Sequence, residues 1–321
     1  MRARWIVPCL AAVVALAGCL VPLSSSPRDS LGADEVSRTF ETIVLETNIG
    51  VIEIVLYPAA APRTVEHMKT LVAEGYYDGR EFNRVVPGHV IQLVDKAGGV
   101  TDDPRRLPLE THPEHHFAAG AAGIARSADP DSGGPEFFLM DYATSHLDGN
   151  YTLWGQTVRG LDVIHRCARV EAIEWTTLLA PLPPDARAAP SDRTAVVPCT
   201  IARARVSQSV LAPEVASRYP LKVAQNHREG DFRHSLEWPR DLRAGVERDL
   251  TWYVRPYNGS APPEASRVTI EVDGRTHAPQ GDREAEGAFH WRFAPSAPGT
   301  HEAVFRVDGR AVGRLAIEVP A

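Results

Sequence analysis

Arg84 and Gln92 are the two side chains of this sequence that are best suited to do chemistry together. They lie on residues 82–94, a strand-like stretch interrupted by Pro87-Gly88. An arginine side chain is always charged, so it can donate a hydrogen bond to an acceptor that forms only in a transition state. The sequence contains no nucleophile elbow, P-loop or dinucleotide fingerprint. Residues 82–94 therefore offer a charged hydrogen-bond donor as one candidate for chemistry.

Three blocks of the sequence resemble the cyclophilin family. The first block matches the family strand F-H-R-x-x-P-x-F-x-x-Q and the aspartate that follows it at Phe82, Arg84, Pro87, Gln92 and Asp95. Residues 123–138 resemble the family pattern G-x-x-A-R-x-x-D-P-x-S-x-x-S-Q-F-F-I, and residues 147–155 resemble L-D-G-x-x-x-V-F-G. One block alone would be weak. The order and spacing of all three agree over about residues 40–207, so the chain is similar to a cyclophilin-type peptidyl-prolyl cis-trans isomerase of the exported bacterial lipoprotein form.

The resemblance implies a mechanism that requires neither a cofactor nor a metal. An X-Pro amide rotates over a barrier of about 20 kcal/mol because the resonance of its nitrogen lone pair must be broken. By the family pattern, Arg84 donates to the nitrogen of the twisted amide, and Gln92 positions Arg84 and the substrate backbone. The implied partners are proline-containing polypeptides, and the implied role lies in protein folding.

The resemblance also assigns the substrate-binding residues. These are Phe82, His89, Val90, Ala125, Arg126, Ser127, Phe138, His146, Leu147 and Tyr151. Val90, Phe138 and Leu147 would line a pocket for the proline ring. Residues 125–127 would form the backbone edge along which the peptide lies.

Several residues depart from the family pattern. His89 stands where the family has Phe, His146 where it commonly has Trp or Phe, and Tyr151 where it commonly has His; Pro135-Glu136 replaces Ser-Gln. Among these changes, His89 makes one wall of the expected pocket smaller and more polar. They leave a second interpretation open, in which a catalytically weakened cyclophilin module binds proline-containing envelope proteins without turnover.

A cluster of histidines is a second candidate site, because it could be interpreted as a metal site. His112, Glu114, His115 and His116 lie close together in the sequence. Their loop is broken by proline and lacks the helical i,i+4 spacing of a zinc motif. We therefore expect a solvated loop and no metal site.

The residues of the cyclophilin-like region, 39–207, predict short strands and two helices. Residues 42–57 have the pattern of a hairpin around Asn48-Ile49-Gly50, and residues 200–206 alternate like a closing strand. Pro62 opens a helix that ends at Gly75, and a second helix fits residues 161–169. The fold implied by the family is mainly β: a closed eight-stranded antiparallel barrel capped by two helices.

A second region follows a linker over residues 208–224. Residues 225–321 hold several alternating stretches and the turn signals Asp273-Gly274 and Asp308-Gly309. This pattern predicts a small immunoglobulin-like β-sandwich. We expect Trp252 and Trp291 in its core rather than on an adhesion surface. The sequence leaves open whether this region binds an unknown protein partner.

The first 19 residues have the pattern of a lipoprotein signal peptide. Arg2 and Arg4 precede an apolar run over residues 5–17, and Leu16-Ala17-Gly18-Cys19 resembles a bacterial lipobox. We expect a lipid on Cys19, a flexible tether over residues 20–38, and a location in the cell envelope, membrane-anchored and facing the periplasm or exterior. The alternative is a plain secretory signal.

Composition limits the remaining partners. The chain has 321 residues, a length that suits two domains. Its formal net charge of −7 gives no reason to expect nucleic acid as a partner. Cys167 and Cys199 remain after the signal, and the sequence leaves open whether they pair or stay as buried thiols.

Overall fold

A computed structural model describes residues 38–94, 106–170, 172–174, 193–216, 218–226, 232–256, 261–281 and 287–321. The predicted signal peptide with Cys19, residues 20–37 of the predicted tether, and Asp95 lie outside the described residues. No helix among the described residues is long and apolar enough to cross a membrane.

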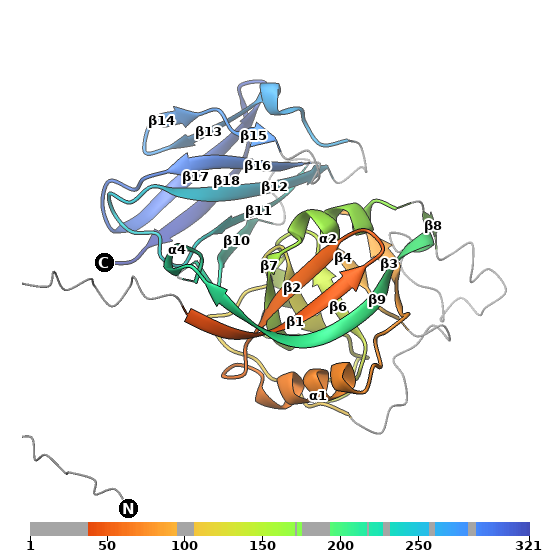
Figure 1. The fold of residues 1–321 in the computed structure, drawn as a ribbon. Coiled ribbons are helices and arrows are strands. Elements are labelled where there is room, and N and C mark those ends of the chain that lie inside the picture. The colour runs from red at the N-terminus through yellow and green to blue at the C-terminus, as the bar shows by residue number, and fades with distance from the viewer. Residues whose placement is uncertain are drawn as a thin grey trace, which may run out of the picture. The chain divides into compact units, whose positions relative to one another are not determined.

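The first part of the described chain is a closed β-barrel with two helices. Its elements are β1 (Arg38–Thr47), β2 (Val51–Leu56), α1 (Pro62–Ala73), β3 (Glu81–Val86), β4 (Val90–Gln92), β5 (Ala121–Ile124), β6 (Phe137–Met140), η1 (Ser145–Leu147), β7 (Leu153–Arg159), α2 (Leu161–Ala168), β8 (Ala172–Glu174) and β9 (Arg193–Leu211). Within the described ranges the strands form one antiparallel sheet in the order β1-β2-β7-β5-β6-β4-β3-β9-β8 (Figure 1). Pairing of β1 with β9 closes a ring of eight strands, and β8 adds to β9 outside the ring. The predicted barrel fold is confirmed.

Local residues explain where the first elements begin and end. The hydroxyl of Thr47 accepts the N–H of Gly50 at 3.0 Å and so fixes the turn between β1 and β2. Pro62 begins α1, where its missing N–H costs nothing. The Glu110 carboxylate accepts two free N–H groups of that first turn, from Arg63 and Thr64 at 3.1 and 2.9 Å.

A disulfide ties helix α2 to the closing strand. Cys167 on α2 pairs with Cys199 on β9, with their Cα atoms 5.4 Å apart. Both residues are fully buried in the barrel core, which also contains Trp154 and Phe82. The question that the sequence left open is therefore answered in favour of the pair.

The second part of the chain is a β-sandwich. Its elements are α4 (Pro213–Ala216), β10 (Lys222–Asn226), β11 (Phe232–Trp238), β12 (Arg248–Pro256), η3 (Ala265–Arg267), β13 (Val268–Val272), β14 (Arg275–His277), β15 (Gln280–Gly281), β16 (Ala288–Phe293), β17 (Gly299–Val307) and β18 (Arg310–Val319). Two sheets of described strands, β10-β11-β12-β16-β15 and β14-β13-β17-β18, share one core. Trp252 and Trp291 are 0% and 5% exposed in that core, as the sequence predicted.

Both predicted Asp-Gly turns of the sandwich are present. Asp273 and Gly274 have φ of 50° and 72°, and Asp308 and Gly309 have φ of 50° and 77°. Positive φ at both central residues is the signature of a type I′ hairpin turn. These turns connect β13 to β14 and β17 to β18.

Residues Val36–Ala321 form one compact unit. Within it, the sandwich contacts the barrel through a junction that we define by Ala119, Tyr142, Ala143, Ser235, Glu237 and Tyr253. Glu237 Oε2 accepts the N–H of Ala119 at 3.0 Å, and the Tyr253 hydroxyl donates to Glu237 Oε1 at 2.9 Å. Ser235 Oγ donates to the carbonyl of Ala143 at 2.8 Å. Burial raises the pKa of Glu237, although both hydrogen bonds oppose the shift.

Candidate functional site

One cavity of the barrel gathers most of the residues that the sequence assigned to substrate. Its volume is about 200 Å³. The lining residues are Arg84, His89, Val90, Gln92, Ala125, Arg126, Phe138, His146, Leu147 and Tyr151. All ten belong to the predicted set, so three strands (β3, β4 and β6), η1 and the neighbouring loops converge on one pocket.

The two predicted catalytic side chains face each other at this pocket. Arg84 on β3 and Gln92 on β4 are register partners, so their side chains lie on the same face of the sheet. Arg84 Nη1 donates a hydrogen bond to Gln92 Oε1 over 2.7 Å. Gly88, with φ of 74°, forms the turn that sets this register. A slip of one residue would send the two side chains to opposite faces.

The floor of the pocket is a small apolar cluster. Phe138 stacks on Phe117 with ring centroids 5.7 Å apart and meets Tyr151 edge-on at 5.8 Å. Gly123 on β5 makes this packing possible, because a Cβ atom there would overlap both phenylalanine rings. The cluster thus offers a preformed apolar surface of the kind that a proline ring requires.

Two histidines form one wall. The rings of His89 and His146 are stacked with centroids 5.7 Å apart and an interplanar angle of 24°. Burial, followed by the charge of Arg84, lowers the pKa of His89 to about 3. His89 is therefore neutral at physiological pH and adds a polar but uncharged surface to the pocket.

Asp141 supports this wall and was not predicted. Its fully buried carboxylate accepts the backbone N–H of Gly88 and contacts His165 Nδ1 at 2.6 Å and Arg169 Nη1 at 3.2 Å. Burial disfavours the charge, but these partners outweigh it and lower the pKa of Asp141. Asp141 also donates its own N–H to the carbonyl of His89 at 2.8 Å. No local pattern marks such a residue, because its partners lie far away in the sequence.

Two predicted residues do not line the pocket. Phe82 is 0% exposed in the barrel core and meets Phe137 edge-on at 5.7 Å. Ser127 instead forms the loop beside the pocket, where its hydroxyl lies 2.7 Å from Ser132 Oγ. The neighbouring Arg126 is held by hydrogen bonds of 2.9 and 2.6 Å to the carbonyl of Asn150.

The histidine cluster is divided among separate partners. His116 Nδ1 lies 2.9 Å from Asp148 Oδ2, and Glu114 pairs with Lys222 at 2.6 Å. His115 packs against Tyr57 with centroids 4.4 Å apart, and burial lowers its pKa to about 4. Over the described ranges, no three His, Cys, Asp or Glu side chains are grouped as metal ligands would be.

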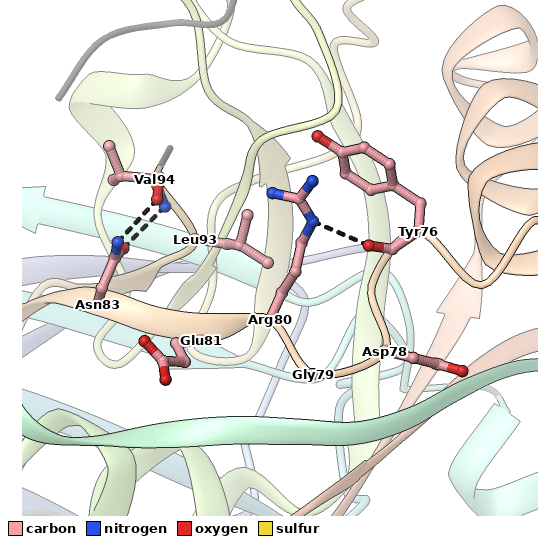
Figure 2. Close-up of a pocket in the computed structure, with 8 residues that line it drawn as sticks. All are labelled: Tyr76, Asp78, Gly79, Arg80, Glu81, Asn83, Leu93 and Val94. Atoms are coloured by element: carbon pink, nitrogen blue, oxygen red, sulfur yellow. Dashed lines mark hydrogen bonds between the residues drawn. The ribbon is translucent and has the colours of Figure 1, made fainter. Parts of the chain in front are cut away.

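A second cavity of about 390 Å³ lies at the start of β3 (Figure 2). Arg80 closes one side: its guanidinium stacks on the Tyr76 ring at 3.8 Å, and its Nε donates to the Tyr76 carbonyl at 2.8 Å. Asn83 exchanges two hydrogen bonds with the backbone of Val94. None of the predicted catalytic or substrate residues lines this cavity.

Comparison with known proteins agrees with this geometry. The model of the family described as cyclophilin type peptidyl-prolyl cis-trans isomerase/CLD matches residues 42–183. A Schizosaccharomyces pombe protein named peptidyl-prolyl cis-trans isomerase is 37% identical over 147 residues, which cover 44% of this chain and 92% of that protein. A Brucella suis protein named probable peptidyl-prolyl cis-trans isomerase is 34% identical over 153 residues, which cover 43% of this chain and 78% of that protein.

Two solved cyclophilin structures are similar to part of this chain. A cyclophilin type isomerase from Cryptosporidium parvum is 19% identical with a TM-score of 0.42, over 52% of this chain and 98% of that one. A cyclophilin from Hirschia baltica is 20% identical with a TM-score of 0.40, over 69% of this chain and 83% of that one.

The barrel and its sequence relatives define an enzyme of the peptidyl-prolyl cis-trans isomerase class. The chain belongs to the cyclophilin-type family of that class.

Proposed function

We propose that this protein accelerates rotation about X-Pro bonds in exported polypeptides and that Arg84 stabilises the twisted amide. The observation that carries the proposal is the 2.7 Å hydrogen bond between Arg84 and Gln92 at the edge of a pocket with an apolar floor. Such a pocket holds the proline ring while the guanidinium stands beside it.

The mechanism follows from how the amide changes during rotation. In the planar ground state the nitrogen lone pair is delocalised and accepts hydrogen bonds poorly. At the twisted transition state the lone pair returns to the nitrogen, which then accepts a hydrogen bond from Arg84. A donor that acts only at this point lowers the barrier without tightening ground-state binding, and each 1.4 kcal/mol is worth about tenfold in rate. Gln92 holds the guanidinium in place through its Oε1 atom.

Turnover of an X-Pro peptide tests the proposal. We expect wild type to accelerate cis-to-trans exchange and Arg84→Ala to lower kcat/KM by about 10²-fold or more, the usual loss for one preorganised donor. Arg80→Ala is the matched control, because Arg80 lines the second cavity and is not among the residues that line the substrate pocket. Equal turnover by wild type and Arg84→Ala would contradict the role of Arg84.

A second candidate function is binding without turnover. The stacked pair of His89 and His146 favours it, since two imidazoles make this pocket wall more polar than the aromatic side chains of the family pattern do. In this case wild type and Arg84→Ala would be equally inert, while a proline peptide would still bind to both with similar Kd values.

We also propose that the protein acts at the cell envelope, held by a lipid on Cys19. The basic and apolar residues before Cys19 support this, as does the pair of Cys167 and Cys199, because disulfides persist in oxidising compartments. Labelled fatty acid should enter wild type and not Cys19→Ala. Label in neither protein would leave only the plain secretory signal.

A further inference from the structure

The sandwich contains a cavity of about 700 Å³ that shares no lining residue with the substrate pocket. Most of its lining comes from β14, β15 and β16. β14 and β15 are edge strands of the two sheets, and β16 is the neighbour of β15 (Figure 1). Small-molecule sites have volumes of about 300–1,000 Å³, so this cavity is large enough to hold a ligand.

Trp291 on β16 brings an unused hydrogen-bond donor to this cavity. The residue is 5% exposed, and its ring meets Phe305 edge-on at 6.2 Å in the sandwich core. Its Nε1 atom is buried and has no hydrogen-bond partner among the described residues. An indole N–H can only donate, and a buried donor without an acceptor is costly. An acceptor on a bound molecule would remove this cost.

His277 on β14 adds a second buried polar atom to the same lining. Its Nε2 atom also lacks a hydrogen-bond partner within the described ranges. Burial, followed by the charge of Arg275, lowers the pKa of His277, so the imidazole is neutral at pH 7. A neutral imidazole has one donor nitrogen and one acceptor nitrogen. Two unused polar atoms on one cavity indicate a ligand that forms hydrogen bonds.

The charges around the cavity balance one another. Asp249 on β12 and Arg292 on β16 line it as register partners, and their side chains pair at 3.4 Å. Arg292 also pairs with Glu247 at 3.4 Å, and Arg218 lies 4.0 Å from Asp249. Two guanidinium groups and two carboxylates leave no net charge that would attract an ion. The lining therefore favours an uncharged ligand.

We propose that this cavity binds a neutral sugar unit. Each hydroxyl of a sugar both donates and accepts hydrogen bonds. This suits a lining that combines the indole donor of Trp291, the imidazole of His277 and the side-chain amide of Gln280. An apolar ligand would leave these polar groups unpaired. The site gives the sandwich a binding function that is separate from the isomerase reaction, for a free saccharide or for a sugar unit of a glycan polymer.

Titration with saccharides, followed by ¹H–¹⁵N NMR of the whole protein, tests the site. The chain has six tryptophans, and the indole signal that is lost in Trp291→Phe is that of Trp291. The probes are glucose and N-acetylglucosamine as free sugars, and maltotriose and chitotriose as pieces of a polymer. We expect at least one of them to shift the Trp291 signal until it saturates. The Kd of a single sugar should be about 1 mM, which about 12–15 non-hydrogen atoms supply.

Variants assign the binding to this lining, with the Kd followed by backbone amide signals. Trp291→Phe keeps an aromatic ring but removes the donor, and it should raise the Kd about two- to tenfold, the net value of one hydrogen bond. Trp238→Phe is the matched control, because Trp238 is also 5% exposed in the same core and does not line the cavity. Gln280→Ala, at an exposed residue, should raise the Kd by a similar factor and guards against misfolding of the tryptophan variant.

The outcomes separate this proposal from its alternatives. No shift of the Trp291 signal with any probe, or an equal Kd in wild type, Trp291→Phe and Gln280→Ala, overturns it. Tighter binding of glucose 6-phosphate than of glucose would contradict a neutral ligand. A lower Kd for a trisaccharide than for its monosaccharide supports a glycan polymer, and equal values support a free sugar. Turnover of an X-Pro peptide should be the same in wild type and Trp291→Phe, so the isomerase function stands or fails independently.

Discussion

The barrel strands beneath the pocket and the strands of the sandwich bury their residues differently. Every residue of β5 and of β6 is buried. In the sandwich, β13 and most of β18 alternate between buried residues and more exposed ones. Alternation is typical of a strand with one face in a core and one face toward solvent.

The difference shows how a pocket can be built on a barrel. The inner faces of β5 and β6 join the main barrel core, which includes Phe137 and Leu139. Their outer faces join a second cluster with Val90, Phe138 and Leu147, the residues that floor the pocket. The pocket therefore lies where the barrel is apolar on both faces, whereas strands β13 and β18 of the sandwich turn one face to the sandwich core.

The largest expected difference between the two regions comes from adding a methyl group to one glycine of the barrel and to one glycine of the sandwich. Gly123→Ala should lower the free energy of unfolding by about 1–3 kcal/mol and kcat/KM by at least tenfold, because the added methyl displaces Phe138 and Phe117. Gly313→Ala in β18 is the matched variant, since its methyl meets the His234 ring at 2.9 Å. It should cost similar stability and keep kcat/KM within twofold. Denaturant unfolding and turnover measure both; an equal loss of activity in the two variants would break the comparison.

The next effect tests whether the junction couples the two regions. Glu237→Ala leaves the Ala119 N–H and the Tyr253 hydroxyl without their partner and should cost about 1–3 kcal/mol of stability. Glu237→Gln keeps an acceptor for the Ala119 N–H and should cost less.

The pH dependence of Glu237 has a definite sign. Because burial raises the pKa of Glu237 in the folded protein, the folded state binds its proton more tightly than the unfolded chain does. The stability contribution is complete below the ordinary glutamate pKa and is lost as pH rises through the raised value. Thermal melting of wild type should therefore decline with pH relative to Glu237→Gln, and parallel curves would contradict the assignment.

The smallest effect concerns His89. With a pKa of about 3, His89 stays neutral between pH 5 and pH 8, so its titration leaves kcat/KM unchanged over this range. His89→Phe should change kcat/KM less than about fivefold and leave the shape of the pH profile unaltered. An inflection near pH 6.5 that disappears in His89→Phe would show that the imidazole gains a proton during catalysis.

Much of the fold could be predicted, because its signals are local. Pro62 and Gly75 mark the helix between them, and the Asp-Gly pairs mark their hairpins, since these residues have few backbone alternatives. The closing strand was predicted over residues 200–206, but β9 spans Arg193–Leu211. Its length depends on pairing with β1 and β3 at distant positions in the sequence.

The lining of one pocket could be predicted, while the roles of its residues stay predictions. The family pattern placed ten residues that the fold brings to one pocket. Asp141 was missed because its environment is created by tertiary contacts. Strand β11 was missed as well, since its buried His234, Ser235 and Glu237 do not alternate with apolar residues as an ordinary strand does.

The most direct measurement of the central claim compares turnover and binding of one X-Pro peptide by wild type and Arg84→Lys. Lysine keeps the charge but lacks the planar guanidinium that donates to Gln92 and that, in the proposed mechanism, also donates to the amide nitrogen. The account predicts that kcat/KM falls by about 10²-fold while Kd changes less than threefold, because the lost interaction exists only in the transition state. A Kd that weakens in step with kcat/KM, or a lysine variant with full turnover, would contradict it.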